Sequence, residues 1–191
     1  RELVISDKVD GMAMSLEFDF SGRLVRASTR GNGQWGEDVT AHVMHVLNVP
    51  KHIRLPSTEG SIKFEIRGEM YFPIEEFPRF ADRFDSYRNA VPGTFGRKEV
   101  DEAVDVLNVL RFRSYDVIGF RRSGSAAEDQ LLEAEQLSLH LGGTYFQKLK
   151  WLESAGFDTG LPEKTTRLLS GTDVRETLPD HVMSAFKQAR D

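Results

Sequence analysis

A lysine, an aspartate and a glycine near the start of the chain form the pattern Lys8-Val9-Asp10-Gly11. A lysine amine attacks phosphorus only after it has lost its proton, and an ordinary lysine has a pKa of about 10.4. Burial in a cleft, neighbouring cations or a bound metal can lower such a pKa. A reactive Lys8 must therefore be held rigidly, which an Asp-Gly turn beside a strand can do. An arbitrary K-x-D-G pattern, in contrast, is usually an exposed lysine next to a turn.

The residues on either side of Lys8 predict strands. Residues 3–5 form a short apolar run, and apolar residues alternate with polar or small ones over residues 12–20, which is the period of a half-buried strand. Ser21-Gly22 predicts a turn, and residues 23–29 predict the returning strand. We therefore expect Lys8 to lie at the edge of a sheet.

Farther along the chain, strands are predicted to give way to helices. Over residues 62–67 apolar side chains alternate with charged ones, which predicts a strand whose charged face could line a nucleotide cleft. Residues 110–120 predict another strand. Apolar spacing predicts helical segments over residues 77–84, 100–107, 131–141, 145–152 and 179–190. Trp35 lies in a Gly-rich loop and is expected to pack over it.

Composition restricts the class of protein. A chain of 191 residues with 39% hydrophobic and 29% charged residues is typical of a soluble globular protein with one domain, or one domain and a small appendage. It has no cysteine, which excludes disulfides and cysteine-ligated zinc and fits a cytoplasmic location. No apolar stretch is long enough to span a bilayer, so no membrane partner is expected. A net charge of −5 argues against a chain that wraps nucleic acid on its own.

Four segments in a fixed order resemble the adenylation domain of NAD+-dependent DNA ligases. The first is Lys8 with Asp10 and Gly11. The second is residues 29–40, TRGNGQWGEDVT, with Asn32 where the family usually has aspartate. The third is Arg67-Gly68-Glu69, and the fourth begins with Arg88-Asn89-Ala90. The resemblance runs from about residue 3 to residue 120 and continues weakly beyond.

This resemblance implies an α+β nucleotidyltransferase fold, ATP-grasp-like, with antiparallel sheets flanked by helices and incomplete at the C-terminal end. Residues 1–191 would be a partial adenylation domain, with a strand-rich nucleotide-binding part over residues 1–120 and a helical part over residues 121–191. Lys8 would attack the α-phosphate of NAD+. AMP would then pass to the 5′-phosphate of a nick in duplex DNA, and the nick would be sealed.

The resemblance also assigns roles to individual residues. Lys8 is the catalytic residue, Arg30 contacts the nucleotide near its ribose and phosphate, Glu69 binds a ribose hydroxyl, and Arg88 contacts phosphate. Without these roles, each would be an ordinary surface or cross-strand charge. NAD and Mg2+ are the expected cofactors, but no residue is assigned as a metal ligand. The spacing of His42 and His45 permits metal binding on a helix, yet no acidic pair or cysteine accompanies them.

The chain also departs from the family pattern. Ser6 replaces the glutamate expected two residues before the lysine, and Gly96 occupies the place of a second arginine. Nothing after residue 120 matches the two late lysine-bearing strands of the family, since the contexts of Lys148, Lys150, Lys164 and Lys187 read as helices or loops. We therefore expect a second ligase subunit or a missing C-terminal region, as in a split or truncated ligase of viral origin. Its location would then be the host cytoplasm.

Two alternatives remain open. An ATP-dependent DNA or RNA ligase, or a related nucleotidyltransferase, shares the lysine motif, although residues 29–40 favour NAD+. A non-catalytic nucleotide-binding subunit would keep the pocket and rely on a partner. Comparing AMP labelling from NAD+ with labelling from ATP distinguishes the first alternative from a NAD+-dependent ligase. The variant Lys8→Ala distinguishes the second, because a non-catalytic subunit would leave the activity of the complex intact.

Overall fold

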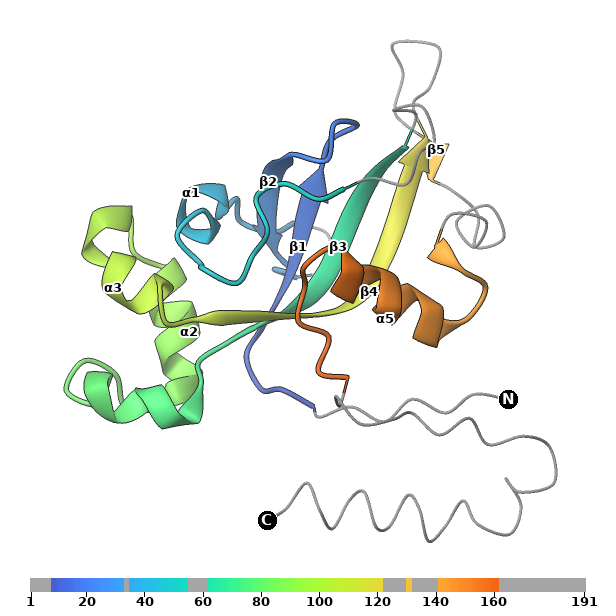
Figure 1. Cartoon of the computed structure of the whole chain (residues 1–191). Coiled ribbons are helices and arrows are strands. Elements are labelled where there is room, and N and C mark those ends of the chain that lie inside the picture. Colours follow the sequence, from blue (N-terminus) through green and yellow to red (C-terminus); the bar gives the residue numbers. More distant parts are fainter. Residues whose placement is uncertain (1–7, 33–34, 55–61, 122–129, 132–140, 162–191) are drawn as a thin grey trace, which may run out of the picture.

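One antiparallel sheet organises the part of the chain that the computed structural model describes, namely residues 8–32, 35–54, 62–121, 130–131 and 141–161. Its strands are β1 (Met12–Phe18), β2 (Leu24–Thr29), β3 (Ile62–Tyr71), β4 (Arg111–Arg121) and β5 (Gln130–Leu131). They lie in the order β2-β1-β3-β4-β5, and every pair is antiparallel (Figure 1). Strands β1 to β4 confirm the strands predicted over residues 12–20, 23–29, 62–67 and 110–120.

Short helices flank the sheet. They are α1 (Thr40–Val43), the 3-10 helix η1 (Ile74–Phe80), α2 (Tyr87–Phe95), the 3-10 helix η2 (Val100–Glu102), α3 (Val104–Leu107) and α5 (Tyr145–Ser154). In Figure 1, α1 lies beside β2 with α2 and α3 farther out on that side, and α5 lies next to β4. A capping box between Thr144 and Gln147 begins α5. Gly156, with a φ of 94°, follows its end.

The two faces of the sheet differ in polarity. Buried apolar side chains come from alternate positions of β1 and β3, because successive residues of a strand point to opposite faces. Helix α5 covers part of this apolar face, where the Trp151 ring lies 5.1 Å from the ring of Phe64. Phe157, which follows α5, packs edge-on against Phe18 and Phe112. The opposite face carries the charged residues of β3, among them Glu65, Arg67 and Glu69.

Four expectations from the sequence need correction. Strand β1 lies inside the sheet, between β2 and β3, so Lys8 precedes an interior strand instead of an edge strand. Residues 100–107 form η2 and α3 instead of one amphipathic helix. Leu131 belongs to β5 and not to a helix. The rest of the expected helix before Leu141, the apolar run at residues 3–5 and the expected helix at residues 179–190 lie outside the described residues.

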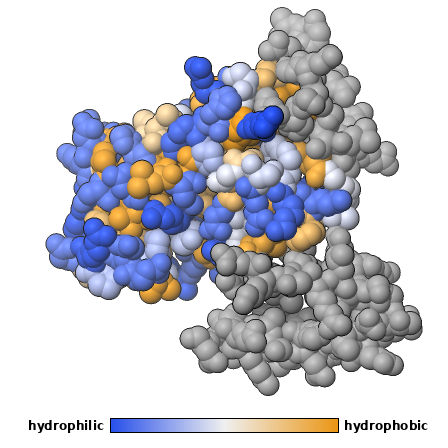
Figure 2. Space-filling view, in the orientation of Figure 1, coloured by the Kyte–Doolittle hydropathy of each residue, from blue (hydrophilic) through white to orange (hydrophobic). Residues whose placement is uncertain are grey.

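The fourth correction concerns Trp35. Its side chain is 80% exposed and does not pack over the loop that carries it. Elsewhere, the face of the molecule in Figure 2 shows hydrophobic side chains in small patches among hydrophilic ones. None of the helices that the structure describes is long and apolar enough to cross a membrane.

Candidate functional site

The turn that carries Lys8 crosses closely over the end of β3. Met12, the first residue of β1, pairs with Met70 of β3. A Cβ atom placed on Gly11 would lie 2.0 Å from the carbonyl oxygen of Met70, which is far inside van der Waals contact. Glycine is therefore required at this position by close backbone packing. This packing holds the Lys8 turn against the strand that carries Glu69.

Glu69 lies at the centre of the polar face, paired with Ala13 of β1 and Arg113 of β4. Burial raises the pKa of Glu69, while the backbone N–H of Gly11 and the positive charge of Lys8 act in the opposite direction. The lysine motif and the third family segment therefore lie side by side.

Arg30 is held near Glu69 by the end of β2. Its backbone N–H donates to the carbonyl oxygen of Ala13 at 3.0 Å. Its positive charge lowers the pKa of Glu69, a smaller effect than that of burial. The loop after Arg30 is closed by Thr29, whose backbone N–H donates to the carbonyl of Glu37 and whose hydroxyl accepts from the Glu37 N–H, both at 3.0 Å.

Arg88 joins the site through Asp10. It lies in the first turn of α2, which begins where the Ser86 hydroxyl accepts a hydrogen bond from the N–H of Asn89. The Arg88 Nε atom lies 2.5 Å from the Oδ2 atom of Asp10. Both side chains are largely exposed, so this guanidinium remains accessible to an anion. The sequence predicted that Asp10 shapes the turn, and the structure adds this ion pair.

A cavity of about 240 Å³ opens between the Lys8 turn, the polar face of β3 and β4, and the segment after α5. Its lining residues are Lys8, Val9, Glu69, Arg113, Ser114, Tyr115, Tyr145 and Thr159. Of the four site residues expected from the sequence, Lys8 and Glu69 line this cavity directly. Arg30 acts electrostatically on Glu69, and Arg88 is linked to the site through Asp10.

A comparison with protein families identifies the family of this chain. Residues 1–173 match the NAD-dependent DNA ligase adenylation domain. The chain belongs to this family.

Curated proteins similar to this adenylation domain include several that are named DNA ligase. The protein from Acinetobacter baylyi is 32% identical over 160 residues, which cover 79% of this chain and 21% of that protein. The protein from Novosphingobium aromaticivorans is 37% identical over 122 residues, 59% of this chain and 16% of the relative. The protein from Halothermothrix orenii is 28% identical over 193 residues, which cover 93% of this chain and 25% of that protein.

The chain thus spans about a quarter or less of the length of these relatives. The relatives are bacterial, so they give no support to the split or viral origin expected from the sequence. They do support the family itself, which the four segments around Lys8, Arg30, Glu69 and Arg88 indicated.

Several residues that line the cavity of this adenylation domain were not predicted from the sequence. Tyr115 is one of them, because β4 contains a bulge at this point: Arg67 pairs with Asp116 and Gly68 with Ser114, which leaves Tyr115 without a partner across the strands. A bulge places one extra residue on a strand and changes which side chains share a face. Alternation counted back from the buried Val117 would therefore assign Tyr115 to the apolar face.

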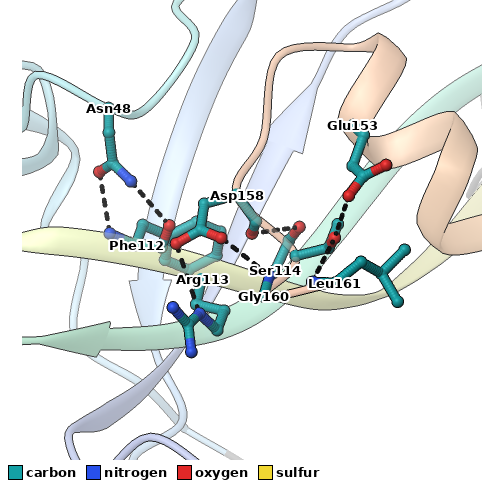
Figure 3. A network of polar contacts seen from close by, with 9 residues as sticks. Asn48, Phe112, Arg113, Ser114, Glu153, Asp158, Gly160 and Leu161 are labelled. Carbon is teal, nitrogen blue, oxygen red and sulfur yellow. Dashed lines mark hydrogen bonds and ion pairs between the residues drawn. The ribbon is translucent and has the colours of Figure 1, made fainter. Parts of the chain in front are cut away.

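The segment after α5 forms another wall that the sequence did not indicate. The carbonyl oxygen of Asp158 accepts hydrogen bonds from the N–H of Ser114 at 2.7 Å and from its hydroxyl at 3.1 Å. The Thr159 hydroxyl donates to Glu153 of α5 at 3.0 Å. Figure 3 shows this network, in which Asp158 joins β4 to the chain that follows α5. The network brings Thr159 to the cavity that Lys8 lines.

Other residues that the sequence singled out lie on helices α1 and α5. Lys148 and Lys150 lie on helix α5, as predicted, and pair with Asp116 and Glu153 at 3.8 and 2.8 Å. The Nε2 atom of His42 lies 3.0 Å from the carbonyl oxygen of Arg97. Among the residues that the structure describes, no three His, Cys, Asp or Glu side chains gather as a metal site. Ser6, Lys164 and Lys187 lie outside those residues.

Proposed function

We propose that this chain is the nucleotide-binding part of a NAD+-dependent DNA ligase and that Lys8 is its adenylated residue. The observation that carries the proposal is the position of Lys8 and Glu69 on one cavity, in a chain whose residues 1–173 match the adenylation-domain family. Residues 1–191 would be a partial adenylation domain, divided near residue 120 into a strand-rich nucleotide-binding part and a helical part. The finer fold would be the ATP-grasp-like nucleotidyltransferase fold.

In the first step, the unprotonated Nζ atom of Lys8 attacks the α-phosphorus of NAD+. A P–N bond forms to Lys8, the P–O bond of the pyrophosphate breaks, and nicotinamide mononucleotide leaves. The step creates no redox change and needs no further reactant. Positioning and neutralisation of charge dominate such phosphoryl chemistry. The close packing of Gly11 against Met70 supports this role, because it fixes the turn that carries the nucleophile.

Three side chains would hold the nucleotide. The carboxylate of Glu69 would accept hydrogen bonds from ribose hydroxyls, which suits its partly buried position beside Lys8. Arg30 and Arg88 would contact the phosphates, since a guanidinium offers several donors to an anion. Arg88 is well suited to this task because its side chain is 66% exposed even when it is paired with Asp10.

The later steps involve partners that this chain would meet in the complete ligase. AMP would pass to the 5′-phosphate at a nick in duplex DNA, and the 3′-hydroxyl would then displace AMP and seal the nick. Parts of the ligase outside this chain, from a missing C-terminal region or a second subunit, would supply most of the contacts to DNA. The net charge of −5 supports this division. The proposed location is the cytoplasm.

Mg2+ is the metal expected for this reaction. Protein sites usually bind it through one or two carboxylates together with phosphates of the substrate. We assign no Mg2+ ligand.

The test is to incubate the chain with NAD+ and Mg2+, with and without the rest of the ligase, and to measure its intact mass. The proposal requires one adenylyl group on Lys8, absent from Lys8→Ala. Labelling from ATP in preference to NAD+ would favour an ATP-dependent nucleotidyltransferase. Ligation that is unaffected by Lys8→Ala would favour a non-catalytic nucleotide-binding subunit.

A further inference from the structure

Arg113 and Glu69 occupy directly opposite positions on β4 and β3. Residues of opposite charge at such positions usually pair, because their Cβ atoms are only about 5 Å apart. The carboxylate that pairs with the Arg113 side chain, however, is that of Asp158, whose Oδ2 atom lies 3.3 Å from the Arg113 Nε atom. Arg113 lies in the same cavity, but its side chain is engaged elsewhere.

The Arg113 side chain turns along β3 toward Tyr71, two residues beyond Glu69. Its guanidinium carbon lies 5.5 Å from the centre of the Tyr71 ring. Its Nε atom donates to the Oδ2 atom of Asp158 at 3.3 Å, and the Arg113 side chain is only 20% exposed. A Cβ atom on Gly160 would lie 2.9 Å from that Nε atom, so glycine at position 160 leaves room for this conformation.

Asp158 is itself held in place by groups other than Arg113. Its carbonyl oxygen accepts hydrogen bonds from the N–H and the hydroxyl of Ser114. Its Oδ1 atom accepts from the N–H of Gly160 at 2.8 Å, which leaves Oδ2 directed toward Arg113 (Figure 3). The carboxylate therefore presents a fixed acceptor to Arg113.

We propose that Asp158 is a positioning residue that holds Arg113 away from Glu69 and so keeps the Glu69 carboxylate available to the hydroxyl groups of a bound nucleotide. The part of this inference that concerns the ligand rests on the proposed function. The part that concerns the two carboxylates and Arg113 rests on the structure alone. Without Asp158, Arg113 would turn to Glu69 and compete with the nucleotide for it.

The variant Asp158→Asn tests this inference with little disturbance to the fold. The asparagine oxygen still accepts from Gly160, and the backbone bonds to Ser114 remain. The oxygen that faces Arg113 becomes an NH2 group, which repels the guanidinium. For the full chain, isothermal calorimetry should show NAD+ binding weakened about tenfold, a change within the usual range of coupling between neighbouring residues.

A second substitution distinguishes the positioning role of Asp158 from a role in which Asp158 only anchors the cavity wall. In Asp158→Asn/Arg113→Gln, the guanidinium that would turn to Glu69 is absent, so most of the lost NAD+ affinity should return. Glu153→Ala is the matched control, because it loosens the same wall through Thr159 without releasing Arg113. If Asp158 only anchors the wall, the double variant will bind NAD+ no better than Asp158→Asn does. Glu153→Ala will then also bind NAD+ as weakly as Asp158→Asn. Either result would overturn the proposal.

A measurement without nucleotide keeps this inference distinct from the proposed function. Titration of the Glu69 side-chain carbon by NMR should show a lower pKa in Asp158→Asn than in the unchanged chain, since a nearby cation favours the carboxylate. The double variant should restore the original value. An unchanged Glu69 titration in Asp158→Asn would refute the positioning role. Failure of the unchanged chain to bind NAD+, with the titration shift present, would refute only the proposed function.

Discussion

Gly11 lies directly against the backbone of Met70, the residue that follows Glu69 in β3. This close approach links the turn that carries Lys8 to the strand that carries the third family segment, although the two are far apart in the sequence. It requires a residue without a side chain, since a Cβ atom on Gly11 would lie 2.0 Å from the carbonyl oxygen of Met70. Changes at either residue are therefore expected to affect both the stability of the fold and the geometry of the site.

Gly11→Ala tests the close approach. The new methyl group would meet the carbonyl of Met70, and overpacking of this kind costs about 1 to 3 kcal/mol of unfolding free energy. The displaced turn should also lower adenylation of Lys8. Gly143→Ala is the control, because a Cβ atom there meets nothing within 4 Å. Urea unfolding of both variants decides the matter, and equal stability would show that the backbone relaxes freely at Gly11.

The raised pKa of Glu69 predicts a pH dependence of stability. Burial raises it from the ordinary value of 4.5, so the folded chain holds this proton more tightly than the unfolded chain does. The protonated Glu69 carboxyl therefore adds to the free energy of unfolding at low pH. This contribution is lost as the pH rises from 4.5 to the higher pKa of Glu69 in the folded chain. Glu69→Gln should therefore gain stability relative to the unchanged chain over the same interval. Urea unfolding at several pH values measures this difference, and a gap that does not change with pH would contradict the prediction.

Arg88→Ala separates binding from folding. Exposed ion pairs contribute little to stability, so loss of the pair with Asp10 should leave the unfolding free energy almost unchanged. Loss of a phosphate contact should weaken NAD+ binding about tenfold. Arg79→Ala is the matched control, since Arg79 is equally exposed and pairs with Glu76 away from the described cavity. Equal NAD+ affinity in the two variants would remove Arg88 from the binding site.

Tyr115 offers an aromatic ring to the cavity. Its side chain is 41% exposed and lies beside Glu69 on the polar face. Stacking of a base on an aromatic ring contributes about 1 to 3 kcal/mol by alanine substitution. Tyr115→Ala should therefore weaken NAD+ binding markedly, whereas Tyr115→Phe should retain it. Binding by the alanine variant as tight as by the phenylalanine variant would exclude a stacking role.

The regular part of the fold could be predicted from the sequence. Apolar residues at alternate positions identified β1 and β3, because each strand has one buried and one polar face. The capping residue Thr144 and the left-handed Gly156 explain why the limits of α5 were also predictable. Such signals are local, so a single sequence contains them.

The parts that could not be predicted depend on contacts between distant segments. The bulge at Tyr115 comes from the pairing of β3 with β4, and no local pattern marks it. The docking of Asp158 on Ser114 joins residues 44 positions apart. The four site residues were found only because their segments resemble a family. Nothing in their spacing alone would have placed Arg88 next to Asp10.

The most direct test of the account is the identity of the residue that becomes adenylated. The chain, combined with the rest of the ligase, is incubated with NAD+ and Mg2+, digested and analysed by tandem mass spectrometry under conditions that preserve P–N bonds. We expect one adenylyl group on the Nζ atom of Lys8, with none in Lys8→Ala. An adenylyl group on another side chain, or sealing of nicks by the assembled Lys8→Ala ligase, would contradict it.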